Sequence, residues 1–237
     1  MGQKPALGGE QAGTEPRAED GGKQAATIGT IERRAELGGE PAAPDPEAEA
    51  LTPDDALALA RENFRFSAMR NAYYHSARLR FYEAQHRALM FGIVLTGTAG
   101  VANIFTAYAG DRWFAGITAL LATLDLVFDL RGKAQLHDSL KRRYFILLAR
   151  LEERPEAGAR QMAKWQSRIY SITAEEPVTY RAVDAVAHNE AIDTLGLDPD
   201  DKQALTKSQY RWRHFYTAQG VTFPYAREVA SAGDSKP

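Results

Sequence analysis

The sequence contains no cysteine, and this absence excludes several kinds of site at once. Without a thiol the chain can form no disulfide, offer no thiolate to a metal ion and use no cysteine nucleophile. Its five histidines are dispersed and form no HExxH pair, so we expect no metal site. Phosphate-binding loops of the Walker A or GxGxxG type and the GxSxG turn of hydrolases are also absent. We therefore expect no cofactor, and the sequence favours a protein that is not an enzyme.

Charged residues are missing from one long part of the chain. From Ala88 to Gly110 there is no Asp, Glu, Lys or Arg, and a second apolar stretch runs from Trp113 to Leu130. A helix needs about 20 apolar residues to cross the roughly 30 Å hydrocarbon core of a membrane. The two runs, joined by a short polar turn, predict a transmembrane hairpin with spans at about 88–110 and 113–130. The alternative is a hairpin buried in a soluble bundle, but a soluble core helix rarely lacks a polar face for about six turns.

The first 51 residues contain no aromatic residue and hardly any aliphatic ones. Gly, Ala, Glu and Pro dominate this segment, which cannot bury enough apolar surface to offset the entropy lost on ordering it. Through Asp55 the chain carries twelve acidic residues against five basic ones. Residues 1–51 are therefore predicted to form a disordered acidic tail.

Strand patterns are absent too, since no run of residues alternates between apolar and polar. Helix signals begin at Thr52, which suits an N-cap, and Pro53, which suits the first helical position. Gly196 suits a helix stop. A narrow apolar seam suited to helix pairing consists of Met162, Trp165, Ile169 and Ile172. We predict an all-α fold: a helical membrane domain over 52–220, a tail over 221–237, and cytoplasmic helices at about 53–87, 131–153, 156–174, 177–195 and 199–219.

Basic residues lie on one side of the predicted hairpin. Arg78, Arg80 and Arg87 precede the first span and five more basic residues follow the second, whereas the turn contains only Arg112. By the positive-inside rule, both termini are predicted to be cytoplasmic. The lipid bilayer is thus the first expected partner of this chain.

Small residues recur at every fourth position in both predicted spans. They are Ala88, Gly92, Thr96 and Gly100 in the first span, and Ala115, Ala119 and Thr123 in the second. Such rows allow helices to approach closely in lipid. The spacing favours a homo-oligomer.

Three strongly polar residues lie within the predicted spans: Asn103, Asp125 and Asp129. Asp129 is near enough to the membrane boundary to reach the interface and pair with Lys133. Asp125 lies deeper, where a charge is costly unless it faces protein or water. Two hypotheses fit this position: Asp125 lines a cation-favouring pore of an oligomer, or it makes an interhelical contact. The candidate pore or interhelical residues are Asp125, Asp129, Asn103, Thr96 and Gly100.

Two polar elements of the predicted cytoplasmic part are not required by folding alone. One lies in the helix over 53–87, and the other begins at the acid–proline start of the helix over 177–195. Helix starts and apolar stripes account for their neighbours but not for most of these side chains. The candidate residues are Tyr74, His75, Arg78, Glu176, Pro177, Tyr180, His188 and Asn189.

These two elements, on either side of a central hairpin, resemble the SLATT family over about residues 55–220. Members of that family are two-transmembrane proteins associated with nucleotide-sensing or nucleotide-synthesising partners in bacterial conflict systems. The resemblance implies an effector in the bacterial inner membrane that is triggered through such a partner. It also implies that the spans assemble an oligomeric pore in antiphage defence.

Two alternatives remain open: a membrane scaffold that anchors a cytoplasmic partner without forming a pore, and a soluble helical bundle. Aromatic and basic residues also alternate over Tyr210–Tyr216, a composition compatible with contacts to nucleic acid. The exposed face of a helix explains this run more simply. We therefore expect no nucleic-acid partner.

Overall fold

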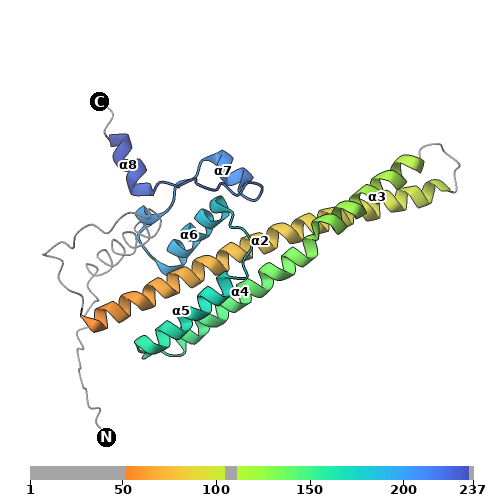
Figure 1. Ribbon diagram of the computed structural model, residues 1–237. Coiled ribbons are helices and arrows are strands. Elements are labelled where there is room, and N and C mark those ends of the chain that lie inside the picture. Colours follow the sequence, from red (N-terminus) through yellow and green to blue (C-terminus); the bar gives the residue numbers. More distant parts are fainter. Residues whose placement is uncertain (1–51, 105–110, 235–237) are drawn as a thin grey trace, which may run out of the picture. The chain divides into compact units, whose positions relative to one another are not determined.

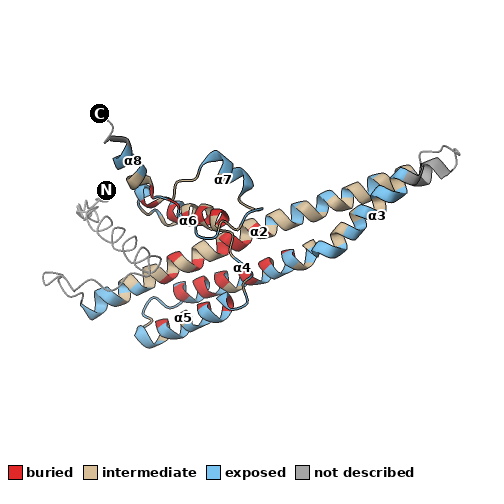
Figure 2. Cartoon of the chain, turned by 45° about the horizontal axis from the view of Figure 1, so that its top comes forward, coloured by how far each residue is buried: buried red, intermediate tan, exposed pale blue. Residues whose placement is uncertain are grey.

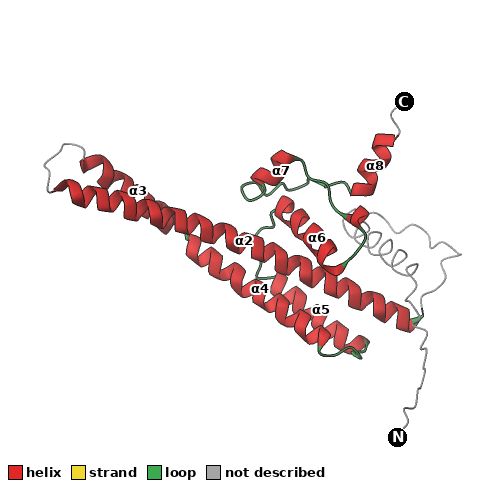
Figure 3. Ribbon diagram, turned by 180° about the vertical axis from the view of Figure 1, so that it is seen from behind, coloured by secondary structure: helices red, strands yellow, loops and turns green. Residues whose placement is uncertain are grey.

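The computed structural model describes residues 52–104 and 111–234, and the side chains of 100–104, 111–112 and 233–234 are outside the description. The predicted acidic tail over 1–51 also lies outside the described residues. Within the described ranges the chain is helix and loop without a strand (Figure 3). The all-α prediction is confirmed for this part of the chain.

The described elements are labelled in Figure 1. They are α2 (Pro53–Ile104), α3 (Asp111–Phe128), α4 (Leu130–Glu152), α5 (Ala159–Thr173), α6 (Arg181–Leu195), the short 3-10 helix η1 (Pro199–Asp201), α7 (Lys207–Trp212) and α8 (Ala226–Asp234). We call α4, α5, α6 and the part of α2 over 53–87 the head.

Helix α2 begins at the cap that the sequence predicts. The Asp55 amide donates to Thr52 Oγ1 at 3.2 Å, and the Thr52 hydroxyl donates to Asp55 Oδ2 at 2.6 Å. The helix then continues for 52 residues, or about 78 Å at 1.5 Å per residue. The predicted cytoplasmic helix over 53–87 and most of the first apolar run are thus one uninterrupted helix (Figure 1).

The N-terminal half of α2 packs with α4 and α5 around a single hydrophobic core. The ring of Phe64 lies 6.2 Å from that of Trp165. The predicted α5 seam faces this core, and all four of its members are buried: Met162, Trp165, Ile169 and Ile172. Full burial of a large apolar side chain contributes about 1.5–3 kcal/mol. This core therefore fixes the three helices to one another, as the buried residues in Figure 2 show.

Helix α6 packs on α2 through two smaller clusters. Phe66 contacts Ala191 and Ile192, and Tyr74 contacts Val183 and Ala187. Gly196 ends α6 in the left-handed conformation, with φ of 65°, so the predicted helix stop is confirmed. In Figures 1 and 3, α2 lies between α6 and the α4–α5 pair.

Helix α3 packs along the C-terminal half of α2. A Cβ at Gly92 would lie 2.9 Å from Leu121 Cδ1, so glycine permits this close approach. The hydroxyls of Thr96 and Thr118 lie 2.7 Å apart. The predicted small-residue row of α3 is exposed and does not take part in this contact: Ala115, Ala119 and Thr123.

One helical stretch among the described residues, Trp113–Glu152, is long and apolar enough to cross a membrane, and none of its apolar window is buried. The other predicted span, 88–110, is only partly described, because 105–110 and the side chains of 100–104 are outside the description. The structure thus gives one candidate span where the sequence predicts two.

Asp129 separates α3 from α4 in the left-handed backbone conformation, with φ of 43°. Its carboxylate accepts a hydrogen bond from the Gly132 amide at 3.1 Å and so caps α4. The predicted pairing of Asp129 with Lys133 is wrong. The carboxylate is used for the cap, and the Lys133 ammonium lies over the Tyr82 ring at 6.0 Å.

The predicted helices at the C-terminal end need correction. The helix expected over 199–219 is only η1 and the six-residue α7, and the expected tail over 221–237 contains α8. The reason is that Gln203 pairs with Tyr225 in an isolated bridge, and the Ala204 amide donates to the Pro224 carbonyl at 2.8 Å. These pairings hold the backbone after η1 extended. Helix α6 likewise begins at Arg181 rather than at Pro177.

Candidate functional site: a buried polar cluster in the head

The structure brings five of the predicted cytoplasmic residues into one place. Tyr74, His75 and Arg78 lie on α2, and Glu176 and Tyr180 lie on the segment between α5 and α6. His75 and Arg78 are almost fully buried. Pro177 lies beside Glu176 in the same segment. We call this group, with the residues that contact it, the buried cluster.

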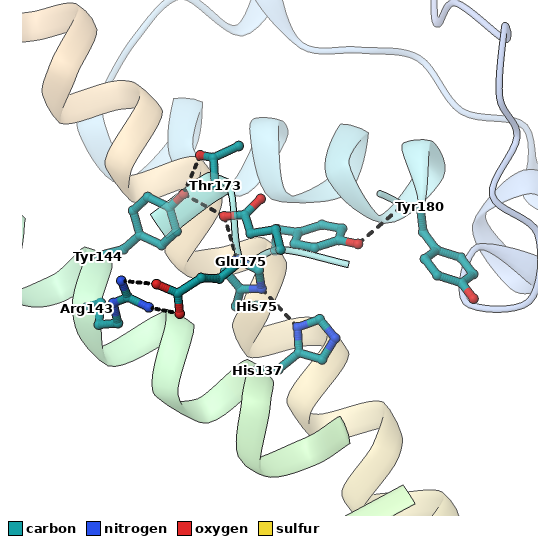
Figure 4. A network of polar contacts seen from close by, with 9 residues as sticks. His75, His137, Arg143, Tyr144, Thr173, Glu175 and Tyr180 are labelled. Carbon is teal, nitrogen blue, oxygen red and sulfur yellow. Dashed lines mark hydrogen bonds and ion pairs between the residues drawn. The ribbon is translucent and has the colours of Figure 1, made fainter. Parts of the chain in front are cut away.

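Glu176 is the central acceptor of the buried cluster. Its Oε1 lies 3.0 Å from His75 Nε2 and accepts the Tyr144 hydroxyl at 2.6 Å. Tyr144 OH also lies 3.2 Å from Thr173 Oγ1. Figure 4 shows Tyr144 and Thr173 converging above His75. One carboxylate thus joins α2, α4 and the end of α5.

A second contact extends the chain of hydrogen bonds to His137. The Nδ1 atoms of His75 and His137 lie 2.9 Å apart (Figure 4). If His75 donates through Nε2 to Glu176 and carries no proton on Nδ1, His137 donates its own Nδ1–H. If His75 carries protons on both nitrogens, its Nδ1–H donates to Nδ1 of His137 instead. The contact therefore needs a single proton between the two Nδ1 atoms. A second proton there would place two donors face to face.

The pKa values of the cluster agree with this arrangement. Burial, together with the charges of His75 and Arg78, lowers the pKa of His137 to about 3, so this imidazole is neutral. Burial would raise the pKa of Glu176, but hydrogen bonds from His75 and Tyr144 outweigh it and hold that pKa below its usual value. Burial and the bond to Glu176 raise the pKa of Tyr144. A neutral His137 and an ionised Glu176 are the stable forms.

Arg78 is a buried cation that lacks a carboxylate partner among the described residues. Its NH1 donates to the His214 carbonyl at 3.0 Å, and its NH2 donates to the Tyr82 hydroxyl. The guanidinium carbon lies 3.8 Å from the Tyr180 ring centroid and 4.7 Å from that of Tyr82. Such faces attract a cation by about 0.5–2 kcal/mol each. Aromatic rings and a carbonyl thus take the place of an acid.

Several members of the buried cluster were not among the predicted candidates. They are Tyr82, His137, Tyr144, Thr173 and His214. His137 had a detectable signal, because it lies on the same stripe of α4 as Leu140, Tyr144 and Leu147, and that stripe is buried. A histidine on an apolar stripe needs a polar partner. His214 gave no such signal, since a distant loop brings it to Arg78.

His188 and Asn189 lie outside the buried cluster and hold the C-terminal segment to α6. His188 Nε2 lies 3.0 Å from the Asp201 carbonyl. The Asn189 side chain donates to the Gln203 carbonyl and accepts from the Gln203 amide, both at 2.8 Å. The Asn189 side chain thus bonds to the Gln203 backbone as a neighbouring β-strand would. His188 and Asn189 therefore hold the start of the segment after α6 against that helix.

The candidate pore residues are only partly described. Asp125 Oδ1 lies 2.9 Å from His86 Nδ1, so within one chain Asp125 makes a contact between α3 and α2. Thr96 also contacts α3, through Thr118. Gly100 and Asn103 lie within α2, but their side chains are outside the described residues.

The hydrogen bonds of the buried cluster connect several elements of the head. Among the described residues no group of three metal-ligating side chains occurs. Most polar atoms of the cluster are hydrogen-bonded to one another, although the buried Nε of Arg78 has no hydrogen-bond partner in the described part of the chain. These bonds join α2, α4, the end of α5 and the loop at His214. Because each bond is directional and buried, a displacement of one element breaks bonds on the others. The buried cluster therefore couples the positions of these elements.

The pH dependence of stability should follow the buried histidines. Burial is the largest cause that lowers the pKa of His137 to about 3, and of His188 and His214 to about 4. In the unfolded chain these groups take up protons below about pH 6.5, whereas the folded protein resists them. Stability should therefore be constant above about pH 7 and fall as the pH drops from 6.5 towards 4. Glu176 adds to the loss at the acid end.

The measurement is the urea midpoint of the full-length Trp113→Phe, Trp212→Phe protein in detergent, in which the buried Trp165 is the remaining tryptophan. His137→Asn, which keeps a polar side chain without an imidazole, should flatten the decline between pH 6.5 and 5. A midpoint that stays the same from pH 7 to pH 5 would contradict the assignment of neutral buried histidines.

No family model, curated protein or solved structure matches this chain.

Proposed function

We propose that the chain is a membrane effector of the kind the SLATT resemblance implies. In this proposal α3 and the C-terminal half of α2 form a hairpin in the bacterial inner membrane. The head lies in the cytoplasm with both termini. A nucleotide-sensing or nucleotide-synthesising partner acts on the head, and several copies open a pore.

The observation that carries the proposal is the apolar surface of the α2–α3 pair. Large apolar side chains point away from the pair on both helices: Phe91 (70% exposed), Val94 (66%) and Leu126 (81%). Soluble proteins rarely expose contiguous apolar surface of this extent. Thr96, Thr118 and Asp125 lie between the two helices and contact one another or His86. The exposed hydroxyls of Thr98 and Thr123 donate to backbone carbonyls of their own helices. An apolar exterior with an inward polar seam is the pattern that a lipid environment favours.

The continuity of α2 supports coupling between head and membrane. The same helix carries Tyr74, His75 and Arg78 in the buried cluster and Gly92 and Thr96 in the contact with α3. No loop intervenes at which movement of the head could be lost. A partner that alters the cluster therefore has a direct route to the hairpin.

The exposed small residues of α3 support oligomerisation. Ala115, Ala119 and Thr123 lie away from the contact with α2. A row of small residues on a lipid-facing surface allows a second helix to approach closely. Asp125 lies on the neighbouring face of the same helix, where rearrangement on assembly can expose it to the pore. The rival function is a scaffold that anchors a partner and conducts no ions.

Expression in bacteria with a potential-sensitive dye tests the effector. The wild-type chain, with its genomic neighbours, should fractionate with membranes and collapse the membrane potential on triggering. Asp125→Asn preserves an acceptor for His86 but removes the charge, and Asp125→Ala removes both. If the pore uses this charge, both variants should lose most of the depolarisation. Thr98→Val, at an exposed position of α2 outside the small-residue row, is the control for a change on the outer face.

The possible results separate the alternatives. Full depolarisation by Asp125→Asn and loss only in Asp125→Ala would assign Asp125 to the interhelical contact and not to the pore. Membrane localisation without any change in potential would support the scaffold. Recovery in the soluble fraction without detergent would overturn every membrane function.

A further inference from the structure

The segment Tyr210–Tyr216 exposes an unusual concentration of aromatic side chains. Over seven residues it presents Tyr210 (52% exposed), Trp212 (49%), Phe215 (55%) and Tyr216 (68%). The head does not need these rings for its core, because the core clusters contain none of them. We call this stretch the aromatic–basic segment, since Arg211 and Arg213 alternate with its rings.

Ring contacts fix the aromatic–basic segment against α2. Phe81 stacks on His214 with ring centroids 4.5 Å apart, and Phe215 lies 5.4 Å from Phe81. Trp212 in turn lies 5.7 Å from Phe215. Arg78 adds the hydrogen bond from its guanidinium to the His214 carbonyl. The segment is thus attached at one level of the long helix.

That level is close to the start of the uncharged run. Phe81 precedes Ala88 by seven residues, or roughly 10 Å along the helix. The headgroup layer extends about 5–8 Å beyond the hydrocarbon core on each side of a bilayer. The side chains of Phe215 and Trp212 can cover the distance that remains between the level of Phe81 and the headgroup layer. If the hairpin spans the membrane as proposed, the exposed rings lie within reach of the headgroups.

The aromatic–basic segment itself carries only basic charge, although Glu190 and Asp193 of α6 line a pocket together with Tyr210. From Lys202 to Arg227 the sequence contains no Asp or Glu. The guanidinium of Arg213 lies 4.1 Å from the Tyr210 ring centroid, and Arg211 is exposed. Burial is the largest cause that lowers the pKa of His214 to about 4, and the positive charges of Arg213, Arg78 and Arg80 add to it. Tyr, Trp and Arg at the membrane surface form the composition of interfacial anchors.

We propose that the aromatic–basic segment is a second membrane contact of this chain, which docks on the headgroups of anionic phospholipids. This inference rests on the proposed membrane hairpin and adds a site to it. Trp212, Phe215 and Tyr216 enter the interface, and Arg211 and Arg213 face the phosphates. The bilayer, rather than nucleic acid, is the partner of this alternating run.

Depth-dependent fluorescence quenching tests the docking. The chain contains three tryptophans, at 113, 165 and 212, and Trp165 is buried in the head. In the Trp113→Phe protein, the change in emission comes from Trp212 above the background of Trp165. In the Trp212→Phe protein it comes from Trp113, and the double variant measures the Trp165 background alone. Each full-length protein is reconstituted into phosphatidylethanolamine–phosphatidylglycerol vesicles that contain a lipid spin-labelled near the headgroup.

Docking predicts that the spin-labelled lipid quenches Trp212 and that acrylamide in the water quenches it less than it does in detergent. Arg211→Gln with Arg213→Gln should reduce the lipid quenching of Trp212, and vesicles of phosphatidylcholine alone should reduce it too. Quenching of Trp113 but not of Trp212 would overturn the docking and leave the hairpin standing. Quenching of neither would overturn both. Protection of Trp212 by a single-stranded oligonucleotide, and not by vesicles, would assign the segment to nucleic acid instead.

Discussion

Ala84→Pro should abolish the depolarisation expected of the proposed effector while both halves of the protein remain folded. Ala84 is an exposed residue of α2 between the buried cluster and the contact with α3. Proline in a helix interior removes a backbone hydrogen bond and clashes with the preceding turn, at a cost of about 3 kcal/mol or more. Because α2 is the uninterrupted connection between head and hairpin, a kink there uncouples them.

The control is Ala84→Gly, which costs only about 1 kcal/mol in a helix and should leave depolarisation largely intact. Membrane fractionation and the emission of buried Trp165 establish that the hairpin is still inserted and the head still folded. Normal depolarisation by a folded Ala84→Pro protein would show that the signal does not travel along α2.

Glu176→Ala will lower the free energy of unfolding of the head by about 2–4 kcal/mol. The substitution removes the acceptor of His75 Nε2–H and one of the two partners of the Tyr144 hydroxyl. A buried donor without a partner costs about 1–3 kcal/mol. Glu176→Gln keeps the side-chain oxygen, so its loss should be about half as large or less.

Glu175→Gln is the matched control, one residue away. Glu175 pairs with Arg143 at the surface, so its removal should change the urea midpoint little (Figure 4). The midpoints are compared at pH 7 by Trp165 emission. Equal losses from the Glu175 and Glu176 variants would show that the buried hydrogen bonds do not hold the head together. If the proposed function holds, the Glu176→Ala protein should also fail to depolarise the membrane, because Glu176 no longer joins α2 to α4 by hydrogen bonds.

The parts of the fold that follow local rules could be predicted. The cap at Thr52, the continuous α2, the α5 seam and the stop at Gly196 depend on residues close together in sequence. The segment after α6 could not, because its extended backbone is fixed by Asn189 and by pairing with Tyr225, both distant in sequence. Propensity alone favours a helix there, and tertiary contacts overrule it.

The candidate site was predictable in part for the same reason. Tyr74, His75 and Arg78 share one face of α2, and Glu176 and Tyr180 belong to one short segment, so each half is visible in the sequence. That the halves meet, and that His137 and His214 complete the group, depends on how α4 and the loop after α7 return to α2. No local pattern contains that information.

Because of the left-handed residue between α3 and α4, the paired helices α2 and α3 differ in how they continue into the head. Helix α2 enters the head without a break, whereas α3 is joined to α4 at Asp129, with φ of 43°. A Cβ at position 132 would meet the Asp129 carboxylate, so a larger residue in place of Gly132 would displace the cap of α4. Backbone hydrogen bonds from Asp129 N to Asp125 O and from Lys133 N to Asp129 O continue through this residue, so the direction of α3 relative to α4 depends on one backbone conformation and one side-chain cap. If the chain assembles as we propose, a substitution at Asp129 would change how α3 is presented to neighbouring copies and leave α2 unaltered.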